Sequence, residues 1–369
     1  MLPCLRPDLV DLAAYAAHPE ETVPLPESLD RLDANENPYE LPAELKAKLA
    51  WIYQHDLRDH RYPDGQYPKL KQAIADYVSA TAGRPVSPAQ ITVGNGSDEL
   101  IRSLLIATCA AGRGSILVAD PTFGMYAILA ATLGIPVIRV PRDPDTWQVD
   151  LAAAQEQLAG SDIRVVFMVH PNSPTGNGLT EAEMAWLRQL PDSTLVVIDE
   201  AYFEFSGQTV LATAPLPPHW VILRTFSKAF RLAGQRVGYG VADPEVIRIL
   251  EKVRLPYNLP SMAQAAAQVV LQHWPEVLAV IPELRQARQD LYAALAPLPD
   301  LRVWPSQANF LFLHPAPGND PLAVQQHLAQ RGTLVRATGG GLRISLGTPD
   351  QNHRTRIALE KRFGRPPTP

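Results

Sequence analysis

Seven short apolar runs, separated by segments of helical character, constrain the fold of this chain more than any other feature. They occupy residues 91–93, 115–119, 136–140, 164–169, 194–198, 220–223 and 237–241. Helical segments lie between several of them, for example at 151–158 and 181–190. Strands that are apolar along their whole length are buried on both faces, and their alternation with helices builds a largely parallel sheet. We therefore predict an α/β fold with a mostly parallel sheet covered by helices on both sides.

The remainder of the chain has a different organisation. Helices are predicted at 243–253 and from 261 to about 295, with breaks at Pro275 and Pro282. Beyond them the pattern predicts strands at 301–304, 308–313, 333–336 and 342–346, with helices at 321–330 and 350–361. This pattern is typical of a smaller α+β domain. We expect an N-terminal arm at 1–30, a small domain from 31–60 and 260–369, and a large domain at 61–259.

Composition narrows the class of protein. The 369 residues carry a net charge of −5, without the basic cluster and interleaved aromatics that nucleic-acid binding requires. No apolar run approaches the roughly 18 residues of a membrane span, and the N-terminal sequence lacks a signal-peptide pattern. Only Cys4 and Cys109 are present, and neither CxxC nor HExxH occurs. We expect a cytoplasmic enzyme with no metal site, no nucleic-acid partner and no membrane association.

Lys228 stands five residues after the expected end of the apolar run at 220–223, in a segment that contains the small hydroxyl residues Thr225 and Ser227. In a partly apolar cleft the pKa of its amine falls, and the neutral amine becomes a nucleophile. Such a lysine forms a Schiff base with an aldehyde cofactor. The alternative is a solvated lysine at the end of a strand.

Other polar residues also follow expected strands, where ligands of parallel α/β sheets bind. Asp199 ends a buried strand and is suited to hold the proton of a pyridine nitrogen; the alternative is a helix cap. Tyr202 lies three residues further on. Phe123 is suited to stack on a flat ring, and Asn172 offers an amide to a phenolic oxygen. The alternatives are a core aromatic and a loop asparagine that satisfies its own backbone.

Anion-binding groups complete the pattern. Gly96, Ser97 and Asp98 precede a helix, whose N-terminal N–H groups suit a phosphate. Arg236 follows Lys228 by eight residues, and an arginine fork binds phosphate well. Arg343 lies inside an apolar strand, so it faces either solvent or an anion such as a substrate carboxylate. Taken singly, these residues are equally compatible with a helix cap and surface ion pairs.

The segments PNSPTG (171–176), DEAY (199–202) and SKAF (227–230) together resemble the fold-type I pyridoxal-phosphate aminotransferases. The resemblance narrows to the histidinol-phosphate aminotransferases through five segments: DANENP (33–38), RYP (61–63), PTFGMY (121–126), LRTFSKAF (223–230) and LRISLG (342–347). They occur in the order typical of that branch and cover most of the chain from about residue 30. The resemblance implies a fold-type I large domain, a smaller α+β domain and pyridoxal 5'-phosphate as the cofactor.

The resemblance also implies a role for each matching residue. Lys228 would hold the cofactor as an internal aldimine and move the proton of the substrate α-carbon, while Asp199 pairs with the ring nitrogen. Tyr202 and Asn172 would contact the 3-oxygen, and Phe123 would stack on the ring. The phosphate would be held by the backbone groups of Ser97 and Asp98, by Thr225, Ser227 and Arg236, and by Tyr62 of the other subunit of a homodimer. Arg343 would bind the substrate's carboxylate or phosphate, with Arg336, Tyr15 and Asn35 as further substrate contacts.

The expected reaction is a ping-pong transfer of an amino group between L-histidinol phosphate and 2-oxoglutarate. The partners would be a small amino donor and a 2-oxo acid. An aromatic amino acid aminotransferase and a threonine-phosphate decarboxylase remain alternatives, because the cofactor chemistry requires nearly the same residues in each. A cofactor-binding protein without catalysis is disfavoured by the presence of Lys228, Asp199, Tyr202 and Arg236 together.

Overall fold

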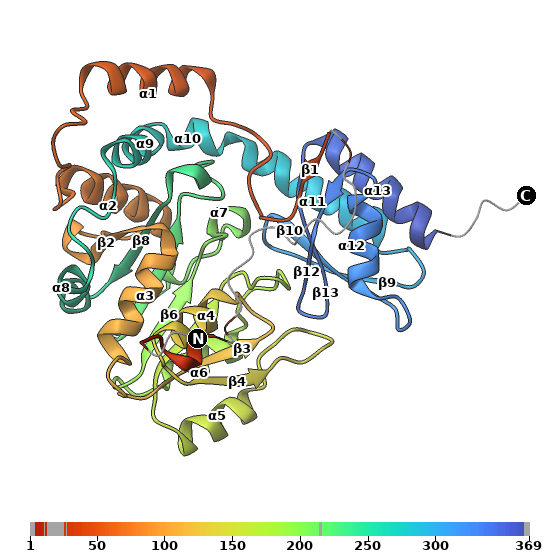
Figure 1. Cartoon of the computed structure of the whole chain (residues 1–369), viewed down its shortest axis with the longest axis horizontal. Helices are drawn as coiled ribbons and strands as arrows, with labels where there is room; N and C mark the ends of the chain where they lie inside the picture. Colours follow the sequence, from red (N-terminus) through yellow and green to blue (C-terminus); the bar gives the residue numbers. More distant parts are fainter. Residues whose placement is uncertain (1–3, 11, 13–25, 27, 214–215, 365–369) are drawn as a thin grey trace, which may run out of the picture.

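A seven-stranded sheet forms the centre of the larger part of the molecule (Figure 1). The computed structural model describes residues 4–10, 12, 26, 28–213 and 216–364. The strands are β2 (Ile91–Asn95), β3 (Ser115–Asp120), β4 (Val137–Pro141), β5 (Ile163–Val169), β6 (Leu195–Asp199), β7 (Trp220–Thr225) and β8 (Val237–Ala242). Their order is β2-β8-β7-β6-β5-β3-β4. Each of the seven apolar runs forms one strand, and the α/β prediction is confirmed.

One strand departs from the parallel arrangement. β8 pairs antiparallel with both of its neighbours, β2 and β7, while the other neighbouring pairs are parallel. Only residues 226–236 connect β7 to β8. A parallel connection needs a crossover of a dozen or more residues, usually through a helix, whereas an antiparallel one does not. The short connection keeps Lys228 and Arg236 at the same edge of the sheet.

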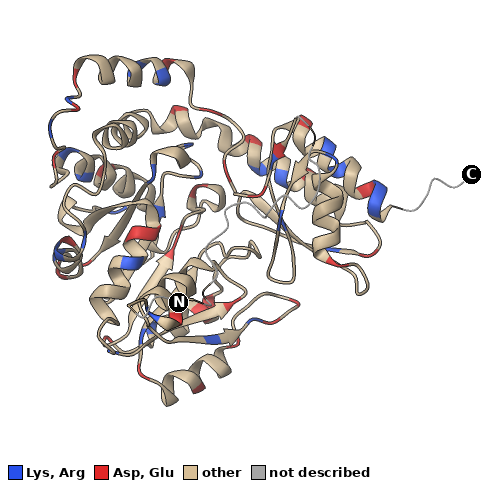
Figure 2. Cartoon of the chain, in the orientation of Figure 1, with Lys and Arg blue, Asp and Glu red and all other residues tan. Residues whose placement is uncertain are grey.

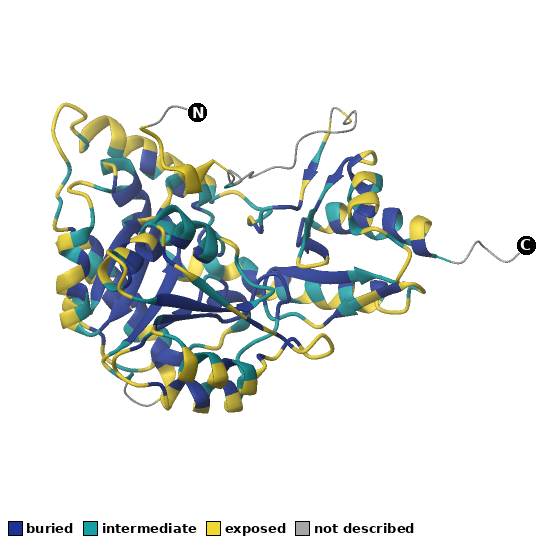
Figure 3. Cartoon of the chain, turned by 60° about the horizontal axis from the view of Figure 1, so that its bottom comes forward, coloured by how far each residue is buried: buried dark blue, intermediate teal, exposed yellow. Residues whose placement is uncertain are grey.

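Helices cover both faces of this sheet, as Figure 3 shows by the band of buried strands between more exposed helices. On one face lie α3 (Gly96–Thr108), α4 (Met125–Thr132) and α8 (Pro244–Val253). The other face packs against α2 (Pro68–Ala82), α5 (Leu151–Gly160), α6 (Glu181–Arg188) and α9 (Ser261–Gln272). Along β5, Val165 and Phe167 face the first group and Val166 and Met168 the second. Both faces are therefore apolar, which explains why the strands show no polar alternation.

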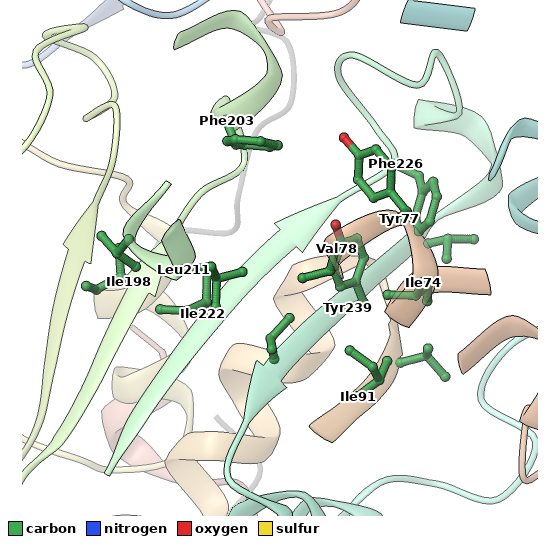
Figure 4. Close-up of a cluster of buried hydrophobic side chains, with 14 of the residues drawn as sticks. Ile74, Tyr77, Val78, Ile91, Ile198, Phe203, Leu211, Ile222, Phe226 and Tyr239 are labelled. Atoms are coloured by element: carbon green, nitrogen blue, oxygen red, sulfur yellow. The ribbon is translucent and has the colours of Figure 1, made fainter. Parts of the chain in front are cut away.

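Figure 4 shows how the second face is packed. Ile74 and Val78 of α2 point toward Ile91 and Tyr239 of the sheet, and all four are buried. The apolar residues of α2 recur at helical spacing, so one stripe of the helix is buried while the other side faces solvent.

The smaller part contains a four-stranded antiparallel sheet in the order β12-β13-β10-β9. Its strands are β9 (Leu301–Trp304), β10 (Phe310–Pro315), β12 (Arg336–Thr338) and β13 (Gly341–Ser345), accompanied by α11 (Ile281–Leu295), α12 (Pro321–Ala329) and α13 (Pro349–Phe363). The strand expected at 333–336 is divided: β11 (Thr333–Leu334) pairs with β1 (Asp30–Arg31), and β12 follows it in the four-stranded sheet.

A run of helices from α9 to α11 joins the two parts, and two further helices lie outside this run. α9 is followed by α10 (Trp274–Val277), a 3-10 turn at Leu278–Val280 and then α11, so the predicted long helix is interrupted near its prolines. α7 (Phe203–Ser206) follows β6. α1 (Ala43–His55) packs on α9 (Figure 1). The domain boundaries themselves stay a prediction.

Charged side chains of both signs are interspersed along the helices and loops (Figure 2). In the part of the chain that the structure describes, no helix combines the length and the apolar character needed to cross a membrane. Among those same residues, no three His, Cys, Asp or Glu side chains converge as a metal site.

Candidate active site

A cavity of about 400 Å³ collects the polar residues that follow the strand ends. It is bounded by the larger sheet, by the segment after β1 and by two strands of the smaller sheet. Its lining includes Ala34, Asn35, Glu36, Ser97, Asp98, Phe123, Ser173, Asp199, Tyr202, Thr225, Ser227, Lys228, Arg236, Arg336 and Arg343. Most of the residues singled out in the sequence are therefore brought together, although they come from distant parts of the chain.

Lys228 lines this cavity, three residues after β7. Its Nζ donates a hydrogen bond of 2.7 Å to the carbonyl oxygen of Ala34. Burial lowers the pKa of the Lys228 amine to about 8, and the positive charges of Arg343 and Arg236 act in the same direction. Lys228 is thus not a solvated lysine at a strand end, and near neutral pH an appreciable fraction of its amine is uncharged.

Asp199 ends β6 and is only 3% exposed. Its Oδ1 accepts a hydrogen bond of 3.0 Å from the backbone N–H of Ala201, and its Oδ2 accepts one of 2.8 Å from the hydroxyl of Tyr126. The bond from Ala201 is a local contact, two residues along the chain, of the kind expected if Asp199 capped the following turn. Burial raises the pKa of the Asp199 carboxyl to about 6, and the two hydrogen bonds oppose that rise. Above this pH the carboxylate can hold the proton of a basic nitrogen placed in the cavity.

An anion cradle lies where α3 begins. Arg236 has a left-handed backbone (φ 54°), and its Nη1 donates to Ser227 Oγ at 3.2 Å. The Thr225 hydroxyl lies 3.0 Å from the same oxygen. Together with the N-terminal N–H groups of α3, these hydroxyl and guanidinium donors suit a phosphate.

Glycines allow the close approach that shapes this cradle. A Cβ on Gly96 would lie 2.5 Å from Arg236 Nη2, and one on Gly238 would lie 2.5 Å from the backbone nitrogen of Ser97. Gly96 also has a φ of +73°, which favours glycine. β8 can therefore pass directly beside the start of α3. The donor set and the space fit the phosphate of pyridoxal 5'-phosphate.

Of the three residues expected around the cofactor ring, Phe123 and Tyr202 line the cavity, whereas Asn172 is not part of its lining. Phe123 lines the cavity, and Tyr202 does so with its hydroxyl accepting a hydrogen bond of 2.9 Å from Asn35 Nδ2. The side chain of Asn172 is buried between two loops, where its Nδ2 donates to Pro121 O after β3 and to Thr175 Oγ1 in its own loop. Neither partner is the backbone of Asn172's own loop, which the alternative interpretation expected. A contact between Asn172 and the cofactor stays a prediction.

Arg343 and Arg336 face the cavity from the smaller sheet. They are direct partners in the register of β13 and β12. Nη1 of Arg343 donates to Ser173 Oγ at 3.1 Å, and its Nη2 donates to Asp33 O at 2.6 Å. Like charges opposite one another on neighbouring strands repel, so this position favours an anionic ligand.

Asn35, Tyr62 and Tyr15 are the remaining residues that the sequence predicted for the site. Asn35 is buried, has a left-handed backbone (φ 55°) and exchanges hydrogen bonds with Ser345, so it braces the segment that carries Ala34. Tyr62 is 81% exposed, stacks on Tyr257 and does not line the cavity of its own chain. Tyr15 lies outside the described residues.

Two contacts were not anticipated from the sequence. They are the hydrogen bond from Tyr126 to Asp199 and the bond from Arg343 to Ser173. Tyr126 stands one helical turn after Phe123 and Ser173 directly follows Asn172. This proximity to predicted site residues was the available signal.

Comparison with known proteins agrees with this geometry. The family described as aminotransferase class I and II matches residues 29–359. A histidinol-phosphate aminotransferase of Synechococcus sp. (strain JA-3-3Ab) is 54% identical over 97% of this chain and 97% of its own length. One of Thermosynechococcus vestitus is 55% identical over 95% of this chain and 94% of its own. The chain belongs to the histidinol-phosphate aminotransferase family.

Solved structures of aminotransferase fold resemble it as well. The histidinol-phosphate aminotransferase of Sinorhizobium meliloti, in complex with pyridoxal-5'-phosphate, aligns with a TM-score of 0.78 at 24% identity, over 90% of each chain. An L-threonine-O-3-phosphate decarboxylase of Porphyromonas gingivalis aligns with a TM-score of 0.76 at 21% identity, covering 91% of this chain and 99% of that one. At such identities the likeness concerns the fold alone. The fold-type I prediction is confirmed, and aminotransferases of this family depend on pyridoxal 5'-phosphate.

Proposed function

We propose that this aminotransferase converts L-histidinol phosphate and 2-oxoglutarate into imidazole-acetol phosphate and L-glutamate, in histidine biosynthesis. The reaction is ping-pong, so the amino donor and the 2-oxo acid occupy the same cavity in turn. The identity of more than half with histidinol-phosphate aminotransferases along nearly the whole chain supports the substrate. The observation that carries the proposal in the structure is the pair Arg336 and Arg343, facing each other at the cavity.

The pair explains how one site accepts two chemically different substrates. Histidinol phosphate has a phosphate but no carboxylate, whereas glutamate and 2-oxoglutarate have carboxylates and no phosphate. Guanidinium groups bind both kinds of oxyanion through charge-assisted hydrogen bonds. Arg343 is anchored through Ser173 and Asp33, which orients its guanidinium toward the cavity before a substrate arrives.

Bound pyridoxal phosphate supplies an aldehyde that reacts with amines and a protonated ring that withdraws electrons from the substrate α-carbon. The residues of the chain do the rest. The backbone N–H groups of Ser97 and Asp98, together with Thr225, Ser227 and Arg236, would bind the phosphate. Asp199 would hold the proton of the ring nitrogen, Phe123 would cover the ring, and the hydroxyl of Tyr202 would contact the 3-oxygen.

Lys228 would act twice in this scheme. As a neutral amine it would attach the cofactor, and once displaced by the amino donor its Nζ would move the proton between the substrate α-carbon and the cofactor. A pKa of about 8 suits both tasks, because a general base acts best near the working pH.

A homodimer with shared active sites belongs to the same proposal. Tyr62 stacks on Tyr257 with ring centroids 4.6 Å apart, and Leu255 beside it is also exposed. Exposed aromatic and aliphatic side chains that gather in this way favour contact with another protein surface. In the dimer, Tyr62 would reach the cofactor phosphate of the other subunit.

A cytoplasmic location is also proposed, and cell fractionation tests it.

A single-turnover assay tests the substrate. The purified protein, loaded with pyridoxal phosphate, is mixed separately with histidinol phosphate, phenylalanine and tyrosine, and loss of the visible absorbance of the lysine-bound cofactor is followed. Fast reaction with histidinol phosphate and slow reaction with the aromatics supports the proposal. The reverse order would make the protein an aromatic aminotransferase. In a separate incubation with threonine phosphate, decarboxylation without transamination would point to the decarboxylase alternative.

A further inference from the structure

The hydroxyl of Tyr126 and the carboxylate of Asp199 form a contact that the proposed roles do not yet use. Tyr126 lies in α4 and Asp199 at the end of β6, 73 residues away in the chain. The hydroxyl donates to Oδ2 at 2.8 Å, while Oδ1 receives the backbone N–H of Ala201. Each carboxylate oxygen thus has one protein donor and keeps lone-pair capacity for a ligand in the cavity.

The ring of Tyr126 is held firmly, so its hydroxyl has a defined direction. The residue is 0% exposed. It stacks on Phe167, with centroids 4.5 Å apart and planes at 14°, and meets the edge of Phe123 at 5.5 Å and 85°. One side chain therefore contacts both the carboxylate expected to hold the ring nitrogen and the aromatic expected to cover the ring.

The charges around this contact determine which group carries the proton. Burial, followed by the charge of Asp199, raises the pKa of Tyr126 well above its ordinary value, so its hydroxyl remains a donor. Asp199 itself is surrounded by Asp98 and Glu200, whose charges raise its pKa in addition to burial, with Tyr202 nearby. The bonds from Tyr126 and Ala201 lower that pKa, and Tyr126 has the larger effect.

We propose that Tyr126 is a positioning residue that keeps Asp199 an ionised, oriented carboxylate and, through Phe123, aligns the aromatic side chain that would cover the cofactor ring. This inference rests on the proposed cofactor role of Asp199 and extends it to a residue that never touches substrate. Without the hydroxyl, the buried carboxylate of Asp199 loses its side-chain donor and keeps only the backbone N–H of Ala201, so its ionised form is less stabilised relative to its protonated form.

The apoprotein gives the first test, because it is independent of any reaction. The protein is labelled with ¹³Cγ-aspartate, and the Asp199 signal is identified by its loss in Asp199→Asn. In Tyr126→Phe the pKa of Asp199 is expected to rise by about one to two pH units, the effect of losing a hydrogen bond to a charged acceptor. An Asp199 pKa equal to that of wild type would overturn the proposal.

Tyr77→Phe is the matched control. Tyr77 is also buried and also donates to a buried carboxylate, Glu204, at 3.1 Å, but it does not line the cavity. This variant is expected to leave the titration of Asp199 unchanged. An equal rise of the Asp199 pKa in Tyr77→Phe and Tyr126→Phe would show a general effect of core loosening and would overturn the specific role of Tyr126.

Two further measurements complete the test. Replacing Tyr126 by 3-fluorotyrosine keeps the hydroxyl and makes it more acidic, so the pKa of Asp199 is expected to fall. This replacement tests the proposal even where Tyr126→Phe does not fold.

In the loaded enzyme, the acid limb of kcat/KM for the amino donor is expected to move to higher pH in Tyr126→Phe, and an unmoved limb counts against the proposal. If the wild type fails to react with histidinol phosphate, the proposed function fails, but the apoprotein titration still decides the role of Tyr126.

Discussion

The Nζ of Lys228 donates a 2.7 Å hydrogen bond to the carbonyl oxygen of Ala34, which lies 194 residues earlier in the chain. The neighbouring Asn35 is bound to Tyr202 and to Ser345, so the segment that receives the lysine is fixed to both sheets. The bond uses an N–H of the lysine and leaves the nitrogen lone pair available whenever the amine is neutral. The structure thereby orients a nucleophile without neutralising it.

Lys228→Ala is expected to abolish turnover and the visible absorbance of lysine-bound cofactor, while the circular dichroism spectrum stays that of the wild type. The reason is that no other amine occupies this position in the cavity lining. Lys71→Ala serves as the control, since Lys71 pairs with Glu251 and does not line the cavity. Turnover near the wild-type rate in Lys228→Ala would remove this lysine from the mechanism.

The rate at which the apoprotein attaches pyridoxal phosphate is expected to rise with pH and level off above about pH 8. Burial disfavours the ammonium form and lowers the pKa of Lys228 to about 8, so the reactive neutral amine is fully formed above that value. Stopped-flow absorbance between pH 6.5 and 10 measures the profile. A rate that still climbs steeply between pH 9 and 10 would indicate a lysine with an ordinary pKa and contradict the burial argument.

Arg343→Ala is expected to slow the half-reaction with glutamate about 10- to 100-fold, because charge-assisted hydrogen bonds are each worth about 1.5–3 kcal/mol. Arg302→Ala is a suitable control from the same sheet, since Arg302 is exposed and bonds Asp145 outside the cavity. Single-turnover rates with glutamate measure the effect. An unchanged rate in Arg343→Ala would exclude this residue from the substrate site.

The Tyr62 proposal is tested by mixing two inactive variants. Lys228→Ala keeps Tyr62, and Tyr62→Ala keeps Lys228, so a hybrid dimer contains one site with both residues intact. Co-refolding the two variants is expected to restore activity that neither homodimer shows, in proportion to the hybrid fraction measured by native mass spectrometry. If Tyr62→Ala alone retains wild-type affinity for pyridoxal phosphate, or if the hybrid stays inactive, Tyr62 has no role across the subunits.

The sequence was sufficient to predict structural features that are determined by the local sequence pattern, such as strand ends and helix starts. The strand that delivers Asp199 is a continuous apolar run, and the start of α3 at Gly96 follows a strand directly, so both positions could be inferred from local pattern. The arginines at 336 and 343 were anticipated singly. That they are opposite one another depends on the register of β12 and β13, which no local pattern specifies.

Features that depend on long-range packing could not be predicted in the same way. The contact between Tyr126 and Asp199 requires α4 to lie on one particular face of β6, and the contact between Lys228 and Ala34 joins segments from opposite halves of the chain. The orientation of Asn172 is decided by Thr175 in its own loop and by Pro121, which follows β3 and lies 51 residues earlier in the chain. In each case the partner is chosen by tertiary packing, on which residue type and spacing alone give no information.

Behind the cavity, Glu200 and Arg224 form a buried ion pair whose disruption is expected to destabilise the fold. Glu200 is 0% and Arg224 1% exposed, and two guanidinium nitrogens reach Glu200 Oε2 at 3.0 and 2.8 Å. Arg224→Met would leave the carboxylate buried without its counter-charge, which typically costs about 3–5 kcal/mol in the free energy of unfolding. Urea denaturation of the apoprotein measures the loss.

A double variant and a surface pair make this last prediction specific. Glu200→Gln combined with Arg224→Met removes both charges, so it is expected to be more stable than Arg224→Met alone. Arg139→Met breaks the exposed pair with Asp120 and is expected to cost less than about 1 kcal/mol, because solvent already screens that interaction. If Arg224→Met were no more destabilising than Arg139→Met, the buried pair would contribute nothing to stability, and the strand ends that carry Asp199 and Lys228 would have to be held by apolar packing alone.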